Sequence, residues 1–127
     1  MLDSDGMTPI YIQIAEWMEN EILNGTFSVD EKVHSQYTLA EMFNINPATA
    51  AKGLKMLSDE NILYTKRGLG KFVTKDAKQI ILDKRRNETL TRLVRDVVVE
   101  ARQLQVSEEE LIDLIRSMTQ QIEGERE

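Results

Sequence analysis

The sequence predicts a mainly α-helical protein of the α+β class, with one small β-hairpin and a helical C-terminal segment. Apolar residues recur at helical spacing in residues 9–24 and 36–59. Two short β-branched and aromatic stretches, 62–65 and 71–74, flank a loop with two glycines. From residue 76 a second helical pattern continues without proline. We therefore expect one domain over residues 1–75 and a two-helix hairpin over residues 76–127.

The composition excludes several classes of protein. The chain has 127 residues and no cysteine, so disulfides and thiolate metal sites are ruled out. The first ten residues lack the apolar core of a signal peptide, and no apolar run reaches the ~20 residues of a membrane span. The single histidine, His34, has no clustered acids, and no acid–base pair is recognisable. We expect a cytoplasmic protein that is not an enzyme and needs no metal or cofactor.

The charge is distributed unevenly along the chain. The net charge is −6, which at first argues against a nucleic-acid partner. Residues 44–75, however, hold six bases against two acids, a net charge of +4, whereas residues 1–43 hold one base and eight acids. This concentration of positive charge predicts either a nucleic-acid contact or simply a solvated basic surface.

The stretch from Tyr37 to Leu57 is typical of a helix-turn-helix. Ser35 can cap the first helix, and Asn46 can cap the second, whose first position is Pro47. In the second helix Ala50, Leu54 and Leu57 form the inner face, and the opposite face carries Ala48, Lys52 and Lys55, with Thr49 on one flank. Such a helix can enter the major groove of DNA, although a plain surface helix would show the same pattern.

The predicted hairpin loop carries further basic residues. Lys66, Arg67 and Lys71 can bind phosphates, and Gly68 and Gly70 allow positive φ at the hairpin tip. A phosphate-binding loop of the P-loop kind is excluded, because no helix follows the glycines. A basic hairpin directly after a helix-turn-helix predicts the wing of a winged helix.

The C-terminal segment predicts an αα-hairpin with more apolar surface than two helices can bury against each other. A two-fold dimer would cover this surface, and packing onto the first domain is the alternative. The expected interface residues are Leu90, Leu93, Val94, Val97, Leu111, Ile112, Ile115 and Met118.

Two features remain open. Lys84, Arg85 and Arg86 could touch DNA or form a solvated helix face. Gly53, inside a predicted helix, costs roughly 1 kcal/mol relative to alanine. It permits either close helix packing or close approach to DNA.

The N-terminal ~70 residues resemble the winged-helix domain of the GntR family of bacterial transcription regulators. The resemblance is carried by Pro9-Ile10-Tyr11, by Leu39-Ala40 before Phe43, by Glu60-Asn61-Ile62-Leu63 and by the wing from Arg67 to Val73. The turn from Ile45 to Lys52 and the short helical tail are similar to the YtrA-type subfamily, where the tail implies dimerisation. One departure is that Tyr37 stands where many members have a phosphate-binding arginine, so we expect weaker affinity and a weaker salt dependence.

The resemblance implies a homodimeric, sequence-specific regulator, more precisely a repressor of transporter genes, that reads an inverted-repeat operator in double-stranded DNA. It does not identify a small-molecule effector. The alternative is a winged helix used for protein–protein contact without DNA binding, and the basic wing is the feature that separates the two. The residues expected to contact DNA are Ser35, Tyr37, Asn46, Ala48, Thr49, Lys52, Lys55, Lys66, Arg67, Gly68, Gly70 and Lys71.

Overall fold

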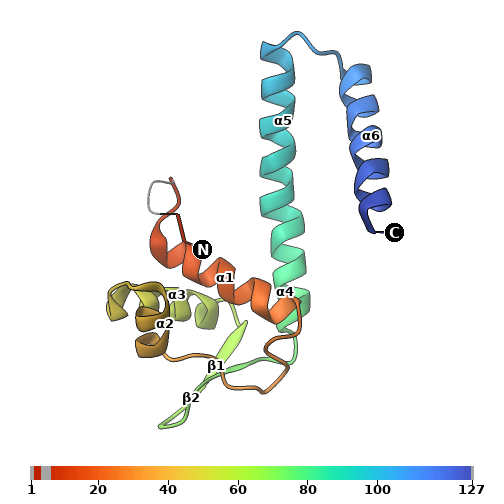
Figure 1. Ribbon diagram of the computed structural model, residues 1–127. Coiled ribbons are helices and arrows are strands. Elements are labelled where there is room, and N and C mark those ends of the chain that lie inside the picture. Colours follow the sequence, from red (N-terminus) through yellow and green to blue (C-terminus); the bar gives the residue numbers. More distant parts are fainter. Residues whose placement is uncertain (1, 4–6, 127) are drawn as a thin grey trace. The chain divides into compact units, whose positions relative to one another are not determined.

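A computed structural model describes residues 2–3 and 7–126, which divide into two compact units. Unit 1, Met1–Lys84, holds α1 (Ile10–Leu23), α2 (Gln36–Phe43), α3 (Pro47–Asp59), β1 (Leu63–Lys66), β2 (Gly70–Val73) and α4 (Ala77–Lys84). Unit 2, Arg85–Glu127, holds η1 (Arg85–Leu90), α5 (Thr91–Gln103) and α6 (Glu108–Arg126). The fold is mainly helical with one two-stranded sheet, which confirms the predicted class (Figure 1). Among the described helices, none has the length and apolar character to cross a bilayer.

The helix-turn-helix forms as its capping residues predict. The Ser35 hydroxyl accepts a hydrogen bond from the Thr38 backbone N–H at 3.2 Å, and α2 begins directly after it. Asn44, with φ of 53°, ends α2 in the left-handed conformation that asparagine tolerates. The Asn46 side chain then accepts from the Ala48 N–H at 2.8 Å, and Pro47 opens α3. The turn geometry is thus fixed by local side-chain caps.

α1 packs across α3 and closes the core of unit 1. Ile14, Met18, Ile22, Leu39 and Leu57 are each at most 1% exposed. Gly53 lies at a close contact between the two helices. A Cβ at this position would be 2.8 Å from the Tyr11 carbonyl oxygen and 3.1 Å from Ile14 Cγ2. Gly53 is therefore required for helix packing, which decides one of the two questions that the sequence left open.

The β-hairpin extends from the core as an antiparallel pair in which Leu63 faces Val73 and Lys66 faces Gly70. A short segment of the loop after α1 adds to it through an isolated bridge between Lys32 and Phe72. The backbone N–H of Val33 donates to the Lys71 carbonyl at 3.0 Å. The segment after α1 thereby anchors the β2 side of the hairpin before it reaches its tip.

Unit 1 ends at Lys84, beyond the boundary at residue 75 that we expected from the sequence. Ala77 and Ile81 in α4 are buried in its core, so α4 belongs with the N-terminal helices. The apolar pair Ile80–Ile81 was visible in the sequence, but the long helical pattern concealed that its first two turns pack on α1.

Lys84 is not part of a solvated helix face, which was one of the two roles that the sequence left open for it. Its ammonium group pairs with the buried Glu19 carboxylate and, at 3.0 Å, with Glu60. Burial by itself would lower the pKa of Lys84, but the hydrogen bonds to the two carboxylates and their charges outweigh it and raise the pKa. Lys84 is thus a structural cation that ties α4 to α1 and to the end of α3.

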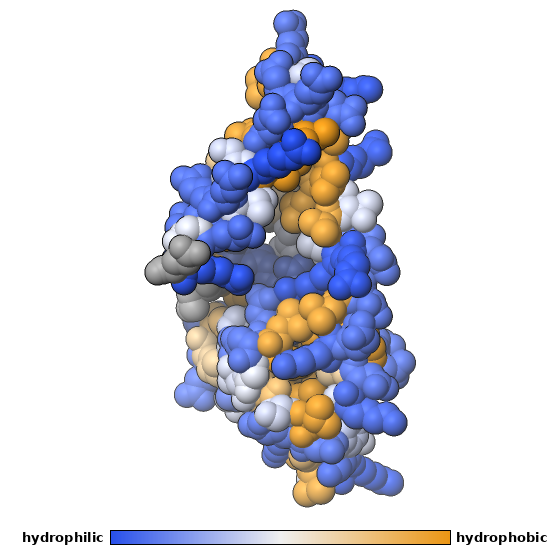
Figure 2. Space-filling model, turned by 90° about the vertical axis from the view of Figure 1, so that its right-hand side faces the viewer, coloured by the Kyte–Doolittle hydropathy of each residue, from blue (hydrophilic) through white to orange (hydrophobic). Residues whose placement is uncertain are grey.

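Unit 2 is an open helical hairpin. It begins with η1, a six-residue π-helix, which leads directly into α5. Ser107 caps the start of α6: its hydroxyl accepts from the Glu110 backbone N–H at 3.1 Å and donates to the Glu110 carboxylate at 3.2 Å. Within α5 and α6, both fully described, Ala101 is the one buried residue. Figure 2 shows apolar side chains exposed among hydrophilic ones on this hairpin.

Candidate nucleic-acid interface

The outward face of α3 is the first part of the candidate site. Ala48, Lys52 and Lys55 are exposed on it, while Ala50 and Leu54 are buried behind. Ala48, near the start of the helix, is small enough to let a DNA base edge approach. The two lysines further along add positive charge to the same face. This surface has the size and charge of a helix that enters the major groove.

Both lysines of this face have partners within unit 1. The Lys52 ammonium lies 4.1 Å from the centroid of the Tyr11 ring. Lys55 forms an exposed ion pair with Asp59 at 2.8 Å. Each contact is worth about 1 kcal/mol or less at an exposed position, so DNA phosphates or base edges can replace it. Tyr11 therefore directs Lys52, a connection between α1 and α3 that sequence spacing does not reveal.

Two other predicted residues of this region have a structural role. Asn46 and Ser35 serve as caps, and the Ser35 hydroxyl also donates to Thr38 Oγ1 at 3.1 Å. Their capping bonds occupy the side-chain oxygens, although the Asn46 amide N–H groups remain available as donors. Thr49 is half-buried on the flank of α3.

The wing tip is the second part of the site. Gly68 and Gly70 have φ of 79° and 117°, the left-handed region that the sequence predicted for this turn. Lys66 lies over the Phe72 ring at 4.5 Å from its centroid. Arg67 is exposed at the tip and, within residues 2–3 and 7–126, makes no ion pair. Arg67 is thus the cation of the wing that is available to a phosphate.

Lys71 behaves differently from the other bases of the wing. Its ammonium donates hydrogen bonds of 2.9 Å to the hydroxyls of Ser58 on α3 and Thr65 on β1. Its side chain therefore holds the hairpin against α3. We assign Lys71 to the shape of the site more than to direct phosphate contact.

A groove of about 340 Å³ lies between the N-terminus of α2 and the wing. Its walls come from three segments and include Ser35, Tyr37, Lys66 and Gly70. The α2 N-terminus brings a partial positive charge to the groove, which suits an anion such as a phosphate. Tyr37 is 70% exposed there, at the position where we expected a neutral hydrogen-bond donor.

Lys32 is a residue of this groove that the sequence analysis missed. Its bridge to Phe72 brings it beside the wing, where its Cε would lie 2.9 Å from a Cβ at Gly70. His34 lines the same groove, and its ring contacts Trp17 and Phe27. The pairing of Lys32 with a strand 40 residues away is a long-range contact, which sequence spacing does not reveal.

One further pair fixes the loop before the groove. The Tyr64 hydroxyl donates to Asp30 Oδ1 at 2.7 Å. This hydrogen bond to the carboxylate, together with burial and the carboxylate charge, raises the pKa of Tyr64. The loop that leads to Lys32 is thereby joined to β1.

Comparison with known proteins agrees with this geometry. The sequence model of the bacterial regulatory proteins of the gntR family matches residues 10–73, from the start of α1 to the end of β2. The chain is 28% identical over 123 residues to the HTH-type transcriptional repressor YtrA of Bacillus subtilis, covering 97% of this chain and 94% of that protein.

Solved structures show the same fold. A GntR family transcriptional regulator from Listeria monocytogenes superposes with a TM-score of 0.71 at 28% identity, covering 91% of this chain and 98% of its own. BusR of S. agalactiae, solved in complex with its busAB-promotor DNA, is 33% identical with a TM-score of 0.57. That match covers 91% of this chain and 57% of BusR.

These likenesses favour DNA binding over a winged helix that contacts only proteins. The matched residues include α3 and the whole wing, which carry the exposed bases described above. The chain therefore belongs to the GntR family of bacterial regulatory proteins and is a DNA-binding transcription regulator.

Proposed function

We propose that the protein is a homodimeric repressor that binds an inverted-repeat operator through α3 and the wing. The observation that carries this proposal is the exposed basic surface formed by the outer face of α3 and the exposed Arg67 at the wing tip. The name of the Bacillus subtilis relative supports repression. The YtrA-type resemblance is the basis for expecting transporter genes among the targets and a cytoplasmic location.

The residues divide into two roles. Ala48, Thr49, Lys52 and Lys55 lie on or beside the outer face of α3 and would contact base edges, with Asn46 near. A second set would hold the DNA backbone and fix the register without reading sequence. It comprises Ser35, Tyr37, Lys66, Arg67, Gly68, Gly70 and the added Lys32, while Lys71 supports this set by holding the hairpin against α3.

The hairpin of unit 2 supports the dimer. Eight apolar side chains of the expected interface lie on α5, α6 and the end of η1, and seven are between 39% and 55% exposed in the single chain. They are Leu90, Leu93, Val94, Val97, Ile112, Ile115 and Met118; Leu111 is half-buried. So large an apolar surface is typical of an interface. A two-fold dimer would place two reading helices on two half-sites of an inverted repeat.

Fluorescence anisotropy on the duplex upstream of the gene for this protein tests the proposal. We expect saturable binding with two subunits per duplex, and much weaker binding to a scrambled duplex of the same composition. Equal binding to both duplexes at every salt concentration would contradict sequence-specific reading. Sedimentation equilibrium without DNA measures the dimer separately, so the failure of one part is distinguishable from the failure of the other.

Two variants assign the roles. Arg67→Ala should weaken binding to both duplexes and reduce the slope of log affinity against log salt by about one. Lys52→Ala should reduce the preference for the upstream duplex over the scrambled one. Arg116→Ala, in α6 and outside the site, is the matched control and should leave both affinities unchanged. A wild-type salt slope in Arg67→Ala would remove the wing tip from the interface.

A further inference from the structure

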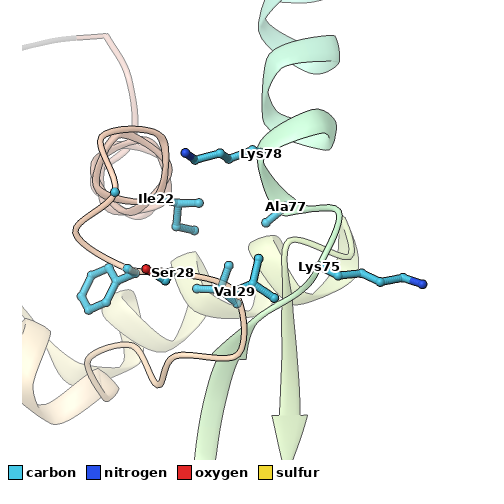
Figure 3. A pocket seen from close by; sticks show the side chains of 9 residues that line it. Ile22, Ser28, Val29, Lys75, Ala77 and Lys78 are labelled. Atoms are coloured by element: carbon cyan, nitrogen blue, oxygen red, sulfur yellow. The ribbon is translucent and has the colours of Figure 1, made fainter.

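Unit 1 contains a second hollow, away from the DNA-facing groove. It has a volume of about 420 Å³ and lies at the end of the β-hairpin opposite the wing tip (Figure 3). Its wall includes Ile22 at the end of α1, Phe27 and Val29 in the following loop, Val73 at the end of β2, and Ala77 at the start of α4. All of these except Val29 are buried. The volume falls within the range of small-molecule sites, about 300–1,000 Å³.

The polar side chains of this cavity are few. Figure 3 shows the Lys78 side chain extending from α4 toward the end of α1, across one side of the cavity, and the Ser28 hydroxyl on the loop side. Lys75 also belongs to the lining, but its side chain points away. No other residue in the described part of the chain forms a hydrogen bond or ion pair with the Lys78 ammonium. The cavity therefore combines apolar walls with one available cation and one hydroxyl.

We propose that this cavity binds a small organic carboxylate with a compact apolar body. The apolar part would cover Ile22, Val73 and Ala77, and the carboxylate would pair with the Lys78 ammonium and accept from the Ser28 hydroxyl. A single cation suits a monoanion. A free phosphate fits less well, because it would bring two charges and no apolar surface to these walls.

The cavity is connected to the DNA-facing groove by one segment of chain. Residues 27–33 leave the cavity wall and run along β2, where the Asp30 N–H donates to the Val73 carbonyl at 2.8 Å. The same segment then supplies Lys32 to the groove. A ligand in the cavity would therefore touch the segment that shapes the wing side of the DNA interface.

The test is an NMR titration of the full chain, labelled with ¹⁵N, with cyclohexanecarboxylate as the probe. Its uncharged analogue, cyclohexanecarboxamide, has the same shape and is the control ligand. We expect the carboxylate to shift the amide signals of Val29, Val73 and Ala77 with a dissociation constant on the order of a millimolar. The carboxamide should bind at least fivefold more weakly. The measurement needs no DNA and is independent of the proposed operator binding.

Two exposed lysines provide matched variants that spare the core. Lys78→Gln should lower the affinity for the carboxylate by about tenfold, since a charge-assisted hydrogen bond is lost. Lys75→Gln removes the same charge from the same region, but should change the affinity less than twofold because this side chain points away. Equal affinity of the two ligands, equal effects of the two variants, or shifts confined to α5 and α6 would each overturn the proposal.

Discussion

Units 1 and 2 differ in how far their apolar side chains are buried. In unit 1 the large apolar side chains of α1, α2, α3 and the hairpin converge on one core, in which Ile14, Leu39 and Leu57 are fully buried. In unit 2 comparable side chains on α5 and α6 stay about half exposed, and Ala101 is the one buried residue of those helices. Unit 1 can thus be stable as a single chain, whereas unit 2 exposes the apolar surface on which the proposed dimer rests.

The largest effect that separates the two units should come from a cavity in the core. Leu57→Ala should lower the free energy of unfolding by about 2–5 kcal/mol, because the removed methyl groups are buried and the surrounding helices cannot fully collapse. The matched change Leu93→Ala, at a side chain that is 49% exposed, should cost unit 1 nothing. Urea unfolding followed by the fluorescence of Trp17, the single tryptophan and a residue of unit 1, measures both. Similar losses in the two variants would show that the units unfold together.

The ion pairs of Lys84 give the next largest effect. Lys84→Met should cost about 3 kcal/mol, because it leaves Glu19 buried without this cation. In the wild type the folded-state pKa of Lys84 is raised, so its contribution is complete below the unfolded value of about 10.4 and is lost as the pH rises through the folded value. Wild-type stability should therefore fall above about pH 10.4 more steeply than that of Lys84→Met, as measured by urea midpoints between pH 8 and 11.5. Parallel pH curves would contradict this assignment.

In unit 2 the substitution with the largest expected effect acts on the proposed dimer. Val97→Asp should weaken the proposed dimer by about 100-fold, because the two-fold symmetry places two charges in the apolar interface. Arg95→Asp, two residues away and outside the apolar stripe, should have little effect. Sedimentation velocity over a range of protein concentrations measures the dissociation constant. A Val97→Asp protein that remains dimeric would show that this stripe does not form the interface.

The smallest expected effects on stability come from the glycines in α3 and α6. Gly53→Ala should destabilise unit 1 by about 1–2 kcal/mol, because the contact with the Tyr11 carbonyl outweighs the gain in helix propensity. Gly124→Ala has open space around its Cβ and should instead stabilise α6 by up to about 1 kcal/mol. Thermal unfolding of the two variants gives both signs. A stabilising Gly53→Ala would mean that α1 moves away from α3 at little cost.

The sequence predicted what depends on local chemistry. The caps Ser35 and Asn46, the proline that opens α3 and the glycines of the wing each act within a few residues, and the structure has them as expected. Contacts between residues that lie far apart in the sequence could not be predicted. The pair Lys84–Glu19 spans 65 residues, and neither partner stands in a pattern that indicates the other. The same holds for Lys32 beside β2 and for Lys52 over Tyr11.

The close approach of α1 to α3 also constrains how the DNA preference of this protein can evolve. The backbone of α3 is held against α1 at Gly53, so exchanges at Ala48, Thr49 and Lys52 would alter the proposed reading surface without moving the helix that presents it. A combinatorial library that varies those three positions and keeps Gly53 samples new operators on one scaffold. In a library that also varies position 53, most members would carry a side chain that prevents α3 from packing against α1.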